Sequence, residues 1–103
     1  MNRIEKILEF LKDSPKDNFL RHSLALEYIK KGEDLKAQIL FEEILFDSPD
    51  YVGSYYHLAK LLEKMEKTEL AIAWYEKGMA AAKKANEQHL YNELQSAYED
   101  LLY

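Results

Sequence analysis

The tripeptide Asp13-Ser14-Pro15 recurs as Asp47-Ser48-Pro49, thirty-four residues further along the chain. When segment 13–46 is laid over segment 47–80 without a gap, eight positions are identical, whereas composition alone would give about two. The five matches outside the tripeptide are Leu24/Leu58, Ala25/Ala59, Lys30/Lys64, Ala37/Ala71 and Glu42/Glu76. A fixed period of roughly 20–50 residues indicates a repeat array, in which each unit stacks on the next. We therefore expect function to lie on a stacked surface and not in a catalytic cleft.

Length and composition describe one small globular domain. The chain has 103 residues, of which 48% are hydrophobic and 32% charged, a balance typical of folded proteins. Its net charge of −5 disfavours nucleic acid as a partner, because binding phosphates requires a clustered excess of Lys and Arg. There is no cysteine, which suits a reducing compartment, and the longest apolar run, Leu70 to Tyr75, is far shorter than the ~20 residues that span a bilayer. We expect a cytoplasmic protein with no membrane partner, no nucleic-acid partner and no cofactor.

Apolar residues recur at three- and four-residue steps, which predicts helices and no strands. The first helix covers 2–13, with Asn2 as its N-cap. The second begins after Asp17 or Asn18 and ends just before Gly32, which can take the left-handed conformation that closes a helix. The remaining helices are expected at 35–46, from Asp50 or Tyr51 to about Met65, at 68–83 and at 86–102, with Asp34 and Thr68 as caps. The turns between paired helices are short, so each pair forms an antiparallel hairpin.

Two units of the chain carry the same pattern of large and small side chains. The first reads Leu24-Ala25-x2-Tyr28, Ala37-x3-Phe41 and Pro49, and the second reads Tyr55-x2-Leu58-Ala59-x2-Leu62 and Ala71-x3-Tyr75. These units resemble the tetratricopeptide repeat, a helix–turn–helix unit of 34 residues with the pattern W-x2-L-G-x2-Y, then A-x3-F, then P. The chain departs from the pattern at Arg21, in place of an aromatic residue, at Ala25, in place of Gly, and at Lys83, in place of Pro.

The change at Lys83 predicts a different exit turn from the second unit. A third start, Tyr91-x2-Leu94-x3-Tyr98, follows Tyr55 by 36 residues and not 34. We therefore place two extra residues in the turn at 83–86.

The resemblance implies an all-α fold, namely a right-handed α-solenoid of antiparallel helix hairpins with about six helices. We divide this single domain of residues 1–103 into an N-terminal half-repeat helix at 2–15, repeat 1 at 18–49, repeat 2 at 52–84 and a C-terminal capping helix at 86–102. Small residues would let helix axes approach closely, and large ones would fill the space between hairpins. The small set is Ala25, Ala37, Ala59 and Ala71, and the large set is Tyr28, Phe41 and Tyr75.

In tetratricopeptide repeats the first helix of each unit lines a concave groove that takes peptide segments of other proteins. The resemblance thus implies a non-catalytic protein-interaction module or adapter. By register, the groove would be lined by Phe19, His22, Ser23, Leu26, Ile29 and Lys30, then by Tyr56, His57, Lys60, Glu63 and Lys64, and then by His89, Asn92 and Glu93, with Ser96, Glu99 and Asp100 beyond. An apolar floor, a basic middle and an acidic far wall suggest a partner segment of mixed character.

One ligand known in this family is not expected here. Chaperone-binding members hold a C-terminal carboxylate with a clamp of Lys, Asn and Arg side chains. The matching places in this chain carry His22, Leu26 and His57.

Two interpretations of the apolar residues Phe19, Leu26 and Ile29 remain open. They lie almost opposite the packing stripe of their own helix, so they could form the floor of a partner groove. They could instead be covered by the N-terminal helix or by another copy of the chain. The alternative function is therefore a self-associating scaffold, a homodimer that uses this patch or a terminal helix.

Catalytic and metal chemistry find little support in the sequence. There is no Gly-rich phosphate loop, no H-E-x-x-H spacing and no nucleophile elbow. His22, His57 and His89 all fall on the expected groove face, where converging imidazoles could bind a transition metal or make binding pH-dependent. Ordinary polar groove residues are the simpler interpretation, so we expect no metal site and no enzyme activity.

Overall fold

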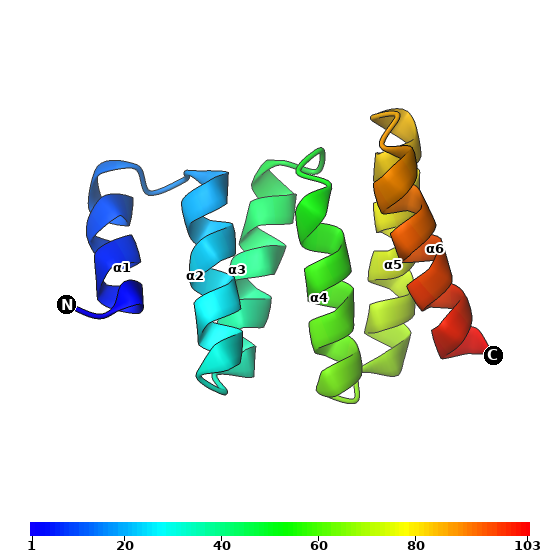
Figure 1. Ribbon diagram of the computed structural model, residues 1–103, viewed down its shortest axis with the longest axis horizontal. Coiled ribbons are helices and arrows are strands. Elements are labelled where there is room, and N and C mark those ends of the chain that lie inside the picture. The colour runs from blue at the N-terminus through cyan, green and yellow to red at the C-terminus, as the bar shows by residue number, and fades with distance from the viewer.

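Six α-helices follow one another along the chain, and none of the residues forms a strand. The computed structural model describes residues 1–103, with α1 (Arg3–Asp13), α2 (Asn18–Lys30), α3 (Asp34–Asp47), α4 (Gly53–Lys64), α5 (Thr68–Lys84) and α6 (Gln88–Leu102). Successive helices run in opposite directions and stack in a row, with the two termini at opposite ends (Figure 1). The predicted all-α solenoid of helix hairpins is confirmed. None of these helices is long and apolar enough to cross a membrane.

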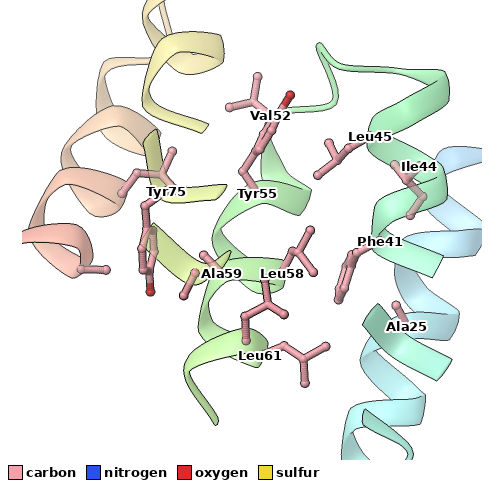
Figure 2. Close-up of a cluster of buried hydrophobic side chains, with 14 of the residues drawn as sticks. Ala25, Phe41, Ile44, Leu45, Val52, Tyr55, Leu58, Ala59, Leu61 and Tyr75 are labelled. Atoms are coloured by element: carbon pink, nitrogen blue, oxygen red, sulfur yellow. The ribbon is translucent and has the colours of Figure 1, made fainter. Parts of the chain in front are cut away.

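Equivalent residues of the two repeats build the core. Ala25, Ala37, Ala59 and Ala71 have no exposed surface, so the helices that carry them pack closely. Phe41 and Tyr75, which occupy the same repeat position, are also fully buried (Figure 2). Burying each such side chain contributes roughly 1.5–3 kcal/mol, so the stacking of hairpins is driven mainly by these repeated residues.

The same backbone motif closes three of the helices. Gly32 follows α2 with a φ of 81°, its N–H bonds to the carbonyl of Ile29, and the next N–H reaches Tyr28. Glu66 after α4 and Asn86 after α5 repeat this Schellman arrangement with φ values of 62° and 59°. Only the first of the three turns carries the expected glycine. The backbone of Glu66, in the same left-handed conformation, is strained by comparison with glycine.

Helix starts are partly as expected. Asn2 and Asp17 are confirmed as N-caps, since their side chains accept the N–H groups of Glu5 and Leu20 at 2.8 and 2.9 Å. The expectation was wrong for the second helix of each hairpin. There Asp34 and Thr68 lie in the first turn and the caps make no side-chain hydrogen bond, because the preceding left-handed residue already sets the turn.

Two other starts come later than the sequence indicated. The helix expected from Asp50 or Tyr51 begins at Gly53, after a turn that includes Pro49, and the last helix begins at Gln88 and not at residue 86. The two extra residues that we placed in the turn at 83–86 lie instead within α5, which has 17 residues against 14 in α3. Because Lys83 replaces the helix-breaking Pro, α5 continues past the point where α3 stops.

Arg21 stands where the family pattern has an aromatic residue, and it stabilises the hairpin through hydrogen bonds. Its guanidinium is buried, donates to Asp47 at 2.9 Å and Asn18 at 2.8 Å, and also reaches the Lys16 carbonyl at 3.2 Å. In the next repeat the equivalent Tyr55 donates its hydroxyl to the Pro49 carbonyl at 2.6 Å. Both side chains therefore tie the turn before their own helix to the hairpin, by different chemistry.

Candidate binding site

A hollow of about 450 Å³ opens between α2 and α4. It is lined by Ser23, Leu26, Glu27, Ile29 and Lys30 of α2, by His57, Lys60, Leu61 and Lys64 of α4, and by Arg3 of α1. We call this set the hollow. Its apolar floor consists of Leu26, Ile29 and Leu61, of which Leu61 is buried and the other two half-buried. Helical spacing puts the α2 residues on one face, since they recur three and four residues apart.

The rim of the hollow is strongly basic. Of the carboxylates only Glu27 lines the hollow, and it is shared between Arg3 and Lys30 at 3.2 Å each. Lys60 and Lys64 contact carboxylates outside the lining, Glu63 at 3.7 Å and Asp34 at 3.2 Å. The four cationic side chains remain about half to three-quarters exposed. Exposed ion pairs of this kind are worth little to stability, so the cations are available to a ligand. The rim therefore carries more positive than negative charge, on a chain whose net charge is −5.

Seven of the fourteen predicted groove residues meet in the hollow. They are Ser23, Leu26, Ile29, Lys30, His57, Lys60 and Lys64. The other seven do not line it. Phe19 stands 69% exposed near the start of α2 and does not line the hollow, whereas Leu26 and Ile29 do.

His57, which lines the hollow, packs against His22, which does not. Their rings meet edge to face with centroids 5.1 Å apart, and the Nδ1 atom of His22 lies 2.8 Å from the Ser54 hydroxyl. Burial, and then the nearby His57, lower the pKa of His22 to about 4. Burial also lowers the pKa of His57, against a smaller opposing effect of Glu93. Both imidazoles are therefore neutral at pH 7 and serve as packing groups as much as surface groups.

The three histidines do not converge. His89 lies on α6, exposed, with its Nε2 3.8 Å from the Glu93 carboxylate. No group of His, Cys, Asp or Glu side chains in the protein has the arrangement of a metal site.

Glu63 and Tyr56 have structural partners. The Glu63 carboxylate accepts the hydroxyl hydrogen bond of the buried Tyr75, which links α4 to α5, and burial with this contact raises the pKa of Tyr75. Tyr56 is half-buried with its ring edge to face against His57. Both side chains therefore make packing contacts within the chain, and neither lines the hollow.

The α6 residues of the predicted groove lie on the far side of the site. Asn92 and Glu93 are exposed, and Asn92 accepts a hydrogen bond from Gln88 at 2.8 Å. Glu93 is the carboxylate that acts on the pKa of His57, so α6 brings negative charge to the edge of α4. The face formed by α2, α4 and α6, here called the groove face, is thus basic toward α1 and acidic toward α6.

Three lining residues were missed from the sequence. Arg3 belongs to a different helix and reaches the hollow only because α1 packs on α2 and its guanidinium contacts Glu27. Glu27 and Leu61 sit at equivalent repeat positions, thirty-four residues apart, and that register could have identified them together.

Comparison with known proteins gives matches among solved structures. A scan against family models and a search of curated proteins find no match. The solution structure of a tetratricopeptide repeat domain protein from Salinibacter ruber matches with a TM-score of 0.81 and 41% sequence identity, covering 84% of this chain and 88% of that one. A Bordetella parapertussis protein matches with a TM-score of 0.85 at 24% identity, covering 99% of this chain and 89% of that one.

A third similar structure is the TPR2B domain of yeast Sti1, solved in a complex with pHsp70. Its TM-score is 0.87 at 15% identity, and the match covers 95% of this chain and 78% of that one. The last two likenesses concern the fold, whereas the Salinibacter match extends to the sequence over most of both chains. Together with the 34-residue register and the paired hairpins, it shows that this chain belongs to the tetratricopeptide repeat family.

Proposed function

We propose that this chain is a non-catalytic protein-interaction module that binds a peptide segment of another protein along its groove face. The observation that carries the proposal is the hollow, in which an apolar floor is surrounded by four exposed cations on an otherwise acidic protein. Binding sites of this kind combine apolar area for affinity with a few charges for orientation. The complex of the Sti1 TPR2B domain with pHsp70 supports it, because a domain of this fold there engages another protein.

The charges of the groove face suggest the character of the segment. An apolar side chain would rest on Leu26 and Ile29, and an adjacent carboxylate would meet Lys60 and Lys64. Toward α6, Glu93 and its acidic neighbours favour basic residues on the same segment. A ligand of mixed charge would thus be held in one direction along the groove face.

We propose no reaction at this site. Ser23 and His57 both line the hollow, but no hydrogen bond joins them. The serine–histidine contact that does form, between Ser54 and His22, involves a serine with no exposed surface. An activated serine needs its base within hydrogen-bonding reach.

The proposal is tested by selecting peptides from a displayed random library on the purified protein. Selected peptides should carry an apolar residue beside Asp or Glu, and the variant Lys60→Glu with Lys64→Glu should lose them. The matched control is Lys77→Glu with Lys83→Glu, which makes the same change of charge on exposed positions of α5. Circular dichroism establishes that both variants stay helical.

Two results would count against a peptide site in the hollow. Selected peptides could bind the Lys60/Lys64 variant as tightly as the parent protein. Backbone amide shifts on peptide binding, followed by NMR, could also fall outside α2 and α4.

A further inference from the structure

The outer face of α3 carries three large apolar side chains that no part of the chain covers. Leu35 is 59% exposed, Ile39 48% and Phe46 87%. At about 100° per residue the three lie within about 40° of one another around the helix, on a stripe about 16 Å long. We call them the α3 stripe. They share no residue with the hollow, which is lined by α1, α2 and α4.

The repeat itself does not require these side chains. The equivalent positions of α5, thirty-four residues later, are Glu69, Ala73 and Ala80. The two equivalent positions within α1 are Glu5 and Lys12. Since the other outer helices fold with small or charged residues there, packing within the chain does not explain the α3 stripe.

The charges beside the stripe have an order along the helix. Lys36 and Glu43 are two turns apart on the same flank, about 100° and 80° around from Leu35. Glu43 has no ion-pair partner in the chain. Lys36 contacts the half-buried Glu33 at 3.2 Å, and its ammonium lies 5.4 Å from the centre of the Tyr28 ring. The flank is therefore positive toward the start of α3 and negative toward its end.

The Glu42 carboxylate lies next to the α3 stripe, and hydrogen bonds hold it on the side away from Lys36. Glu42 accepts a hydrogen bond from the Gln38 amide at 3.1 Å, and the Gln38 oxygen accepts one from Lys67 at 2.9 Å. Gln38 lies about 60° around from Leu35, away from the Lys36 flank. This network draws the charge toward Lys67, at the start of α5, and leaves the apolar side chains free to make contact.

We propose that a second copy of this chain covers the α3 stripe, with the two α3 helices packed antiparallel about a two-fold axis. In this register Leu35 of one copy faces Phe46 of the other. Each Ile39 lies near the axis, level with the alkyl part of Glu42 from the other copy, whose carboxylate is bonded to Gln38. In an antiparallel pair each flank meets the same flank of its partner, so Lys36 of one copy lies opposite Glu43 of the other, twice. A parallel two-fold pair would instead set this flank against the opposite flank of its partner, so only the antiparallel arrangement pairs Lys36 with Glu43.

The dimer is expected to be weak. An exposed aromatic side chain supplies ~150–250 Å², so three side chains per copy leave the total below the ~1,200 Å² at the lower end of stable interfaces. Both hollows stay open, because α3 lies outside them. Two joined modules could then bind two segments of one partner, and the second segment would bind at a raised effective concentration.

The test is sedimentation equilibrium of the whole chain from about 20 µM to about 1 mM, the range for a weak interface. The mass should rise toward twice the monomer mass across this range. Phe46→Glu should abolish the rise, whereas the control Leu70→Glu, at an exposed position of α5, should leave it unchanged.

Charge reversal tests the register. Lys36→Glu and Glu43→Lys should each weaken the dimer at least about threefold, and the double variant should restore it, because both cross-pairs re-form with opposite signs. A monomer at every concentration would overturn the proposal, as would a dimer indifferent to Phe46→Glu. Failure of the double variant to recover would exclude the antiparallel register, and loss of the dimer on Leu26→Asp alone would assign it to the hollow.

Discussion

Replacing Gly78 with alanine tests the packing of α5 against its neighbours. Gly78 is buried in α5, and a Cβ atom built on it would lie 2.7 Å from the Cβ of Tyr55 and 3.2 Å from the Cδ1 of Leu94. The Tyr55 Cβ is attached directly to the backbone of α4 and cannot swing away. The two helices would have to separate by about 0.7 Å to restore an ordinary contact, in a core that deforms little.

The magnitude follows from two opposing terms. Overpacking of this kind costs ~1–3 kcal/mol, whereas alanine is favoured over glycine inside a helix by ~1 kcal/mol. We therefore expect Gly78→Ala to lower the free energy of unfolding by about 1 kcal/mol. Gly53→Ala is the matched control, because nothing lies within 4 Å of a Cβ placed there. This control should raise the free energy of unfolding by ~0.5–1 kcal/mol, because alanine lowers the conformational entropy of the unfolded chain.

Urea unfolding followed by far-UV circular dichroism measures both variants. The helix propensity of alanine contributes to both, so the difference between them reports mainly the packing term, ~1–3 kcal/mol. Equal stability of the two variants, or a more stable Gly78→Ala, would refute the assignment of Gly78 to a closed contact.

Three further predictions concern the turns, the buried arginine and pH. Glu66→Gly should raise the free energy of unfolding by ~0.5–1 kcal/mol in the same urea assay, because Glu66 has a φ of 62°. Arg21→Ala should lower the melting temperature, with a loss of ~1–3 kcal/mol from its broken hydrogen bonds. NMR should then find the pKa of Asp47, which its hydrogen bond to Arg21 lowers, back near its ordinary value. Burial lowers the pKa of His22 from 6.5 to about 4, so the unfolded chain binds more protons in that interval. Stability should be full above pH 6.5 and fall as the pH drops toward 4, and urea midpoints of His22→Gln should show a shallower fall.

The repeated architecture could be predicted from the sequence because its causes are local and recur in step. The spacing of apolar residues determines each helix, and the 34-residue offset aligns Ala25 with Ala59 and Phe41 with Tyr75, which the fold buries equally. Seven of the ten residues that line the hollow could be predicted in the same way, since residues three and four apart on α2 and α4 must share a face.

Only the tertiary structure decided features that depend on distances between helices. Arg3 joins the hollow because α1 packs on α2, and His22 is withdrawn from it because Ser54 and the His57 ring lie against it. Gly78 likewise stands where the other repeat has Ile44, since Tyr55 and Leu94 already fill that space. Periodicity specifies which side a residue faces, but contact across an interface depends on how closely two helices approach, and that distance is set by all their side chains together.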